Sequence, residues 1–257
     1  MIRIGPGGFG GNPLEKIGGL AEKGLTAAEV EFTYGVRMKN PAAQELGKLN
    51  QKFRIYLSIH APYYINLASK EEEKISASRK RILDSCERGH HMGAKYVVFH
   101  AGFYQGRGAE EVYQIIVKEV RDLVETIKKK GWKLNLAPET TGKESQFGSL
   151  DEIIRLKKDT GCHICVDFAH LKARNKGKID HDEIMKKLKP LGHIHAHFSG
   201  IEWTDKGERR HIGTGEKEIR ELLTYLIKYD IDCTIINESP DPIGDSVRTL
   251  EILKEVQ

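Results

Sequence analysis

The chain repeats one unit, a short apolar or β-branched run followed by a longer segment in which apolar residues return every three or four positions. The longer segments, such as Glu110 to Lys130 and Gly215 to Tyr229, predict amphipathic helices. The short runs predict eight strands: Ile2 to Ile4, Ala28 to Phe32, Ile55 to His60, Tyr96 to His100, Lys133 to Glu139, His163 to Asp167, His193 to Phe198 and Cys233 to Glu238. Eight βα units in 257 residues predict an α/β fold, a single (β/α)8 TIM barrel that fills residues 1–257 as one domain.

Several protein classes are excluded by simple properties of the chain. No apolar run approaches the ~18 residues of a membrane span, so we expect no membrane partner. The N-terminus, MIRIGPGG, lacks the basic and apolar regions of a signal peptide, and four scattered cysteines are too few for a disulfide framework. We therefore expect a cytoplasmic protein, and we expect a monomer. The net charge of +4 permits a polyanionic partner without identifying one.

Alternation of side chains along each predicted strand separates an apolar set from a small or polar set. In the fourth strand, for example, Val97 and Phe99 oppose Val98 and His100. The polar set is expected to face the barrel interior. Six consecutive strands end this inward set with a potential metal ligand: His60, His100, Glu139, Asp167, His197 and Glu238.

These six residues predict a metal centre at the carboxyl ends of the strands, where barrels of this type carry their active sites. Mixed imidazole and carboxylate ligands suit Zn²⁺ or Mn²⁺ better than Ca²⁺ or Mg²⁺. His170, in the turn after Asp167, can reach the same face, so two or three ions are expected. A centre with several ions suits phosphodiester hydrolysis. His193 and His195 share the inward face with His197 but lie deeper, which indicates barrel filling or support of a ligand.

Two further motifs carry less weight. Gly5, Gly7 and Gly10 fit G-x-G-x-x-G, with Glu29 or Glu31 at the spacing of a dinucleotide-binding fingerprint. The strand before them is short and extra glycines surround them, so we favour a flexible first loop and no nucleotide cofactor. Cys162 and Cys165 are three residues apart in a predicted strand, which places them on opposite faces and argues against a shared ion.

The motifs around the six strand ends resemble the endonuclease IV family of apurinic/apyrimidinic endonucleases. They are IHAPYYINLAS at His60, FHAG at His100, APETTG at Glu139, VDFAH from Asp167 to His170, HAHFSG at His197 and INES at Glu238. The resemblance runs from the third strand to the end of the chain. It implies a TIM barrel with three zinc ions that cleaves DNA on the 5′ side of an abasic site, a reaction of base excision repair.

The resemblance also implies individual roles. His60, His100 and Glu139 would hold one zinc, and Glu139, expected to be central to catalysis, would bridge to a second zinc held by a further three residues: Asp167, His197 and Glu238. His170 would belong to a third zinc. Tyr63 and Tyr64 would lie where the family inserts side chains into DNA, or would simply pack within their loop.

The chain departs from the family pattern in two places. The family has an Asp-x-His pair after the seventh strand, whereas this chain reads DKGERRHIGTG, with His211 as the nearest substitute and Glu208 as a possible partner. The family also has a histidine after the first strand, where this chain is rich in glycine. Both departures concern the third metal.

Basic residues cluster in the segments that follow the sixth and seventh strands, on the face predicted to hold the metals. They are Lys172, Arg174, Lys176, Lys178, Lys206, Arg209 and Arg210. Of these we expect Arg174, Arg209 and Arg210 to contact the phosphates of double-stranded DNA that contains abasic sites.

Two other functions fit the sequence. A sugar isomerase or epimerase of the xylose isomerase-like barrels would need only four ligands for one divalent ion, Glu139, Asp167, His197 and Glu238, and would leave three of the histidines unused. A barrel that binds nucleic acid without cleaving it is the other alternative. Metal content and turnover would separate the three.

Overall fold

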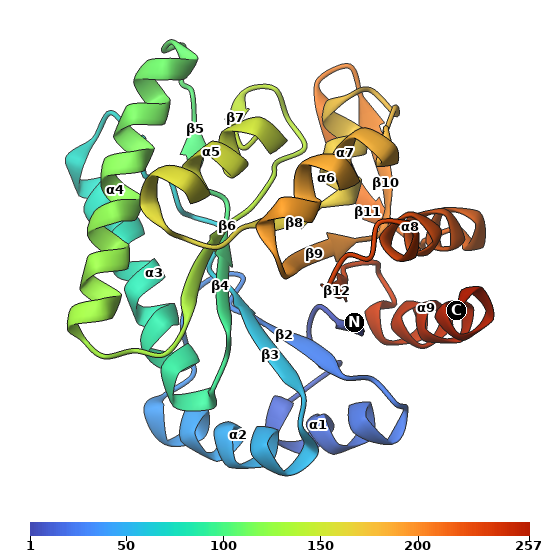
Figure 1. Cartoon of the computed structure of the whole chain (residues 1–257). Helices are drawn as coiled ribbons and strands as arrows, with labels where there is room; N and C mark the ends of the chain where they lie inside the picture. Colours follow the sequence, from blue (N-terminus) through green and yellow to red (C-terminus); the bar gives the residue numbers. More distant parts are fainter.

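The computed structural model describes residues 1–257 and is a closed barrel of eight parallel strands (Figure 1). All eight predicted strands are present, several of them one or two residues shorter than predicted. The barrel strands are β1 (Ile2–Pro6), β2 (Ala27–Glu31), β3 (Tyr56–His60), β4 (Tyr96–Phe99), β6 (Asn135–Pro138), β8 (Cys165–Asp167), β9 (Ile194–Phe198) and β12 (Cys233–Asn237). The predicted (β/α)8 barrel is confirmed.

The barrel wall consists of two four-stranded parallel sheets with the strand orders β1-β12-β9-β8 and β2-β3-β4-β6. We call these two sheets the half-sheets of the barrel, and the two places where they meet its seams. One isolated β-bridge crosses each seam. Gly7 pairs with Glu29 between β1 and β2, and Glu139 pairs with Cys165 between β6 and β8. Two backbone hydrogen bonds strengthen the first seam, from Thr26 N to Ile4 O at 3.1 Å and from Gly8 N to Glu29 O at 2.9 Å.

The first seam depends on Gly5. A Cβ atom at this position would lie 1.7 Å from the carbonyl oxygen of Ala27, far inside van der Waals contact. Gly5 lies within β1, and Gly7 forms the isolated bridge that follows this strand. The prediction of a flexible loop was wrong at these two positions, because the glycines let two neighbouring strands approach each other closely.

Helices cover the outside of the barrel (Figure 1). The predicted helices at Glu110 to Lys130 and Gly215 to Tyr229 are confirmed as α4 and α8. The nine α-helices are α1 (Pro13–Glu22), α2 (Asn40–Phe53), α3 (Glu72–Met92), α4 (Ala109–Lys129), α5 (Leu150–Thr160), α6 (Phe168–Arg174), α7 (His181–Leu188), α8 (Glu216–Lys228) and α9 (Pro242–Val256). No helix combines the length and the apolar character that a membrane span requires.

The predicted alternation separates two apolar layers. Val97 and Phe99 belong to the large core between strands and helices, whereas Val98 packs with Ala137 inside the barrel. Cys162 lies in the core between strands and helices, whereas Cys165 lies inside the barrel. The C-x-x-C pair therefore does not converge on one ion. All four cysteines are free and buried.

Four short strands project from the carboxyl end of the barrel. They form two antiparallel pairs, β5 (Gly102–Phe103) with β7 (Gln146–Phe147), and β10 (Gly200–Thr204) with β11 (Gly207–Ile212). The predicted loop after the seventh barrel strand is therefore largely a β-hairpin. The predicted turn that holds His170 is the first part of helix α6, which begins directly after β8. Asp167 caps this helix, and its Oδ1 accepts from the backbone N–H of His170 at 2.7 Å.

Candidate metal centre

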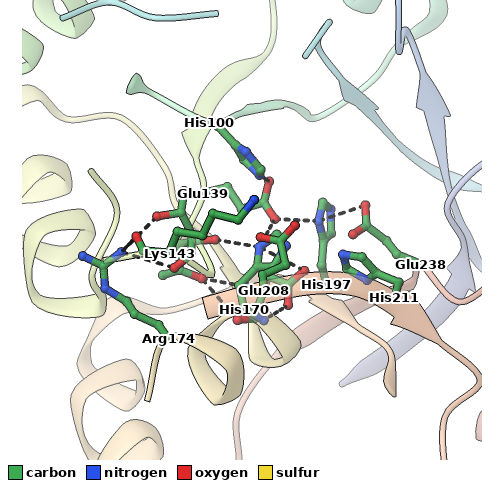
Figure 2. A network of polar contacts seen from close by, with 12 residues as sticks. His100, Glu139, Lys143, His170, Arg174, His197, Glu208, His211 and Glu238 are labelled. Carbon is green, nitrogen blue, oxygen red and sulfur yellow. Dashed lines mark hydrogen bonds and ion pairs between the residues drawn. The ribbon is translucent and has the colours of Figure 1, made fainter. Parts of the chain in front are cut away.

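The six predicted strand-end residues converge at the carboxyl end of the barrel. Together with His170 and His211, their side chains form several overlapping groups in which the donor atoms all lie within 4.8 Å of one another. Three of these groups are His60, His100 and Glu139; then Glu139, Asp167, His197 and Glu238; then Asp167, His170 and His211. Glu139 is common to the first two groups and Asp167 to the last two. The donors thus form one continuous cluster, most of which is seen in Figure 2.

Glu139 lies at the middle of the cluster and is fully buried. Its carboxylate oxygens are 3.2 Å from His60 Nε2, 3.0 Å from His100 Nε2, 3.2 Å from His170 Nδ1 and 3.2 Å from His197 Nδ1. These imidazoles come from both half-sheets of the barrel. A carboxylate in this position can share its two oxygens between neighbouring cations.

Three of the histidines have one ring nitrogen fixed by an oxygen outside the cluster. His60 Nδ1 donates to Ala61 O at 2.8 Å, and His170 Nδ1 donates to Thr140 O at 3.0 Å, since a carbonyl can only accept. The hydroxyl of Ser199 donates to Gly200 O and accepts from His211 Nδ1 at 2.6 Å. Because Nδ1 of each ring is engaged in this way, Nε2 is the nitrogen that each ring can offer to a metal in exchange for a proton.

The electrostatics of the cluster also suit cations. Burial alone would raise the pKa of Glu139, but His100 and His197 hold this pKa well below its usual range. Burial alone would lower the pKa of His60, but Glu139 and Glu31 raise it to about 10. Asp167 Oδ2 is buried and accepts no hydrogen bond. An orphaned carboxylate oxygen among imidazoles is the environment that a divalent cation satisfies, so the residues fit zinc or a similar ion.

A β-bulge determines which residues of the β10–β11 hairpin reach the cluster. Glu202 pairs with Arg210 and Trp203 pairs with Glu208, so Arg209 is an extra residue in β11. In a regular strand, residues three positions apart point to opposite faces. The bulge turns Glu208 and His211 to the same face, where Glu208 Oε2 is 3.5 Å from His170 Nε2 and the His170 and His211 rings are 5.2 Å apart.

Two acidic residues of the site were missed by the sequence analysis. Glu29 is fully buried inside the barrel, and Glu31 lines the cleft above it, where its Oε1 accepts no hydrogen bond. The alternation of side chains along this strand could have revealed both residues. Ala28, Val30 and Phe32 all face the outer core, so the residues between them point into the barrel.

The cluster forms the floor and walls of a cleft of about 490 Å³ that also contains Gln146, Glu208 and Ser239. A larger cavity of about 900 Å³ lies at the opposite end of the barrel, among residues such as Arg3, Arg54 and Lys95. We assign the chemistry to the smaller cleft, because the buried donors converge there and because active sites of such barrels occupy the carboxyl end.

Exposed aromatic side chains surround this cleft. Tyr63, which lines it, and its neighbour Tyr64 are 57% and 61% exposed. Tyr34, from the segment after β2, meets the Tyr63 ring edge to face with ring centres 6.3 Å apart. The guanidinium of Arg81 donates to Tyr64 O at 3.0 Å and holds this segment in place.

The predicted phosphate-binding arginines have different surroundings. Arg174 Nη1 donates to Lys143 O at 2.7 Å and to Gln146 O at 3.1 Å, so this side chain braces the segment between β6 and β7 (Figure 2). Arg209 and Arg210 are exposed on β11, and both approach Glu202, Arg210 at 2.7 Å. Their contact with DNA stays a prediction.

A buried cluster of imidazole and carboxylate donors at the carboxyl end of a (β/α)8 barrel is typical of metal-dependent barrel enzymes. The sequence matches the xylose isomerase-like TIM barrel family over residues 19–256, and the chain belongs to that family. Members of this superfamily bind divalent metals.

Relatives within the family carry different names. An uncharacterized protein of Methanocaldococcus jannaschii is 35% identical over 92% of this chain and 90% of its own length. A probable endonuclease 4 of Cenarchaeum symbiosum is 26% identical over 87% of this chain and 89% of its own length. The family is therefore established, while the names of the relatives differ.

Solved structures with the same fold also carry different names. Endonuclease IV from Thermus thermophilus superposes with a TM-score of 0.75 and 18% identity, covering 98% of this chain and 99% of its own. A D-tagatose 3-epimerase-like protein superposes with a TM-score of 0.75 and 22% identity, covering 99% of this chain and 96% of its own. At such identities the likeness concerns the fold alone.

Proposed function

We propose that this chain is a metal-dependent phosphodiesterase that incises double-stranded DNA on the 5′ side of abasic sites. The observation that carries the proposal is that more imidazole and carboxylate donors converge, in overlapping groups that share Glu139 and Asp167, than a single ion needs. A centre of several ions stabilises both the attacking and the departing oxygen of a phosphodiester. Sugar isomerisation at one ion would leave His60, His100, His170 and His211 without a task.

Two or three zinc ions would be held by these groups, and Mn²⁺ is the other candidate. The ions would supply positive charge for the phosphate and would activate water. The protein's own contribution is to fix the ligands, since Ala61 O, Thr140 O and Ser199 Oγ accept from Nδ1 of three imidazoles and leave Nε2 as the nitrogen that can bind an ion. Glu208, beside His170, would complete the third group.

The rim of the cleft supports a nucleic-acid substrate. Tyr34, Tyr63 and Tyr64 expose ring faces on which unstacked bases can pack. Arg209 and Arg210 provide exposed positive charge on the hairpin beside the cleft. The cytoplasmic location and the monomeric state expected from the sequence remain predictions.

The alternative is a sugar isomerase or epimerase, and one observation favours it. Glu139, Asp167, His197 and Glu238 alone form a complete group for one ion, and Glu31 adds a carboxylate to the cleft above. A carboxylate at this position suits proton transfer to or from a sugar better than it suits a phosphate group.

One experiment separates these functions. The metal content of untagged protein is measured by mass spectrometry, and the same protein is incubated with a duplex that carries one abasic analogue and with an intact duplex as control. In parallel, the protein is incubated with a ketose, and its binding to the abasic duplex is measured. Two or three zinc ions and a single 5′ incision of the abasic strand support the endonuclease. One ion, an uncut duplex and turnover of a ketose support the epimerase, while DNA binding without any incision indicates a non-catalytic barrel.

A further inference from the structure

His197 differs from the other histidines of the cluster in how its outer nitrogen is held. His60 and His211 each direct Nδ1 to a neutral oxygen, and His170 Nδ1 donates to Thr140 O, although carboxylate oxygens of Glu139 and Asp167 also lie 3.2 and 3.4 Å from this nitrogen. His197 is turned the other way: its Nδ1 faces Glu139 at 3.2 Å and Glu238 at 3.3 Å, and its Nε2 lies 2.9 Å from Glu29 Oε1. The partner of its outer nitrogen is thus a carboxylate.

Glu29 is well placed to hold this ring. The side chain comes from β2 and crosses the barrel interior to β9, where its second oxygen, Oε2, is 2.9 Å from His195 Nε2. Glu29, His195 and His197 are all fully buried, so water does not compete for these contacts. His195 and His197 are two residues apart on one strand face, and a single carboxylate therefore joins both rings.

We propose that Glu29 is a positioning residue of the metal centre. Its Oε1 lies 2.9 Å from Nε2 of His197, where its charge favours the proton on that nitrogen and thereby leaves the Nδ1 lone pair for the ion, although neither atom completes a hydrogen bond in this structure. A carboxylate that accepts from the outer N–H of a ligating imidazole fixes the tautomer and strengthens the ligand. His195 donates to the other oxygen and keeps the carboxylate aligned across the barrel. The proposal rests on the metal centre of the proposed function and is independent of DNA cleavage.

The substitution Glu29→Gln tests this role, because the amide keeps the shape of the side chain but removes its charge and one acceptor. The matched control is Ser58→Ala. Ser58 is the register partner of Glu29 on β3, is fully buried and has a hydroxyl with no hydrogen-bond partner. Both variants alter the same layer of the barrel interior, and only Glu29→Gln alters the contact with His197.

Two measurements are made on chelator-treated full-length protein. Zn²⁺ affinity is measured by competition with a chromophoric chelator, and the protonated ring nitrogen of His197 is identified by long-range ¹H–¹⁵N correlation in histidine-labelled protein. We expect wild type and Ser58→Ala to show His197 protonated at Nε2 and to bind Zn²⁺ alike. Glu29→Gln should bind one of the ions about 10- to 100-fold more weakly and should lose the uniform Nε2–H tautomer.

Three outcomes would overturn the proposal. In one, His197 of the Zn²⁺-loaded wild type carries its proton on Nδ1. In another, Glu29→Gln binds Zn²⁺ as tightly as Ser58→Ala does, which would leave the metal centre and the proposed function intact. In the third, wild type binds no Zn²⁺ at all, and then the metal centre fails together with this proposal.

Discussion

Replacing Gly5 with alanine should open the seam between β1 and β2. The new Cβ would lie 1.7 Å from Ala27 O, so the two strands must separate by roughly 1 Å or more before the contact is tolerable. The hydrogen bonds from Thr26 N to Ile4 O and from Gly8 N to Glu29 O, now 3.1 and 2.9 Å long, would then stretch to about 4 Å and be lost.

The expected loss in the free energy of unfolding follows from these contacts. Two backbone hydrogen bonds contribute about 1–3 kcal/mol together, and overpacking adds about 1–3 kcal/mol. Alanine recovers only about 0.4–1 kcal/mol by restricting the unfolded chain. The net effect is a destabilisation of about 1–6 kcal/mol, measured by urea unfolding of chelator-treated protein followed by far-UV circular dichroism.

Gly19→Ala is the matched control for this substitution. Gly19 lies inside α1, and no heavy atom outside its own stretch of helix comes within 4 Å of an added Cβ. Alanine in this position should stabilise the protein by about 0.5–1 kcal/mol through its helix propensity. If Gly5→Ala cost less than about 1 kcal/mol, or behaved like Gly19→Ala, the argument that Gly5 permits close strand packing would be refuted.

Three further predictions concern the site and its surroundings. Glu139→Gln should lower the rate of abasic-site incision by on the order of 100-fold or more with an unchanged circular dichroism spectrum, and a rate within tenfold of wild type would contradict its central role. Glu208→Gln should lower the zinc content by one ion. Deletion of Arg209 should preserve the zinc content, because Glu208 and His211 would then be two residues apart in a regular strand and would still point to one face. Zinc content is measured by mass spectrometry, and the reverse result would reject the argument from the bulge. Burial, assisted by Lys157, lowers the pKa of His163 from 6.5 to about 3, so the folded state disfavours the proton that the unfolded chain accepts. The contribution of neutral His163 to the free energy of unfolding is therefore present above pH 6.5 and is lost as the pH falls toward 3, by about 2 kcal/mol at pH 5. His163→Phe should remove this part of the pH dependence, measured by urea titrations at several pH values.

The barrel and most of the metal cluster could be predicted from the sequence. Short apolar runs indicate the eight strands, and alternation within a strand then decides which side chains enter the barrel. His60, Asp167 and Glu238 needed only this rule, since parallel strands of a barrel bring their carboxyl ends together. To predict His170, one must also expect that a helical turn begins directly after β8, because this turn places His170 over the same face.

What the sequence analysis missed depends on longer-range geometry. Glu29 and Glu31 obey the alternation rule but were considered only for their spacing from a glycine motif, and that motif proved to serve strand packing at Gly5. The orientation of Glu208 depends on a bulge, which no periodicity reveals. Arg174 belongs to a basic run, yet its guanidinium braces backbone carbonyls of a distant segment.

The seam between β6 and β8 has a consequence for how the metal-free protein folds and takes up its ions. His60 and His100 belong to one half-sheet, whereas Asp167 and His197 belong to the other, and Glu139 lies at the seam between them. Neither half of the chain can complete the central group of donors alone. Ions bound by this cluster would therefore connect the two half-sheets across this seam, and metal binding would report that the two halves of the barrel have closed on each other.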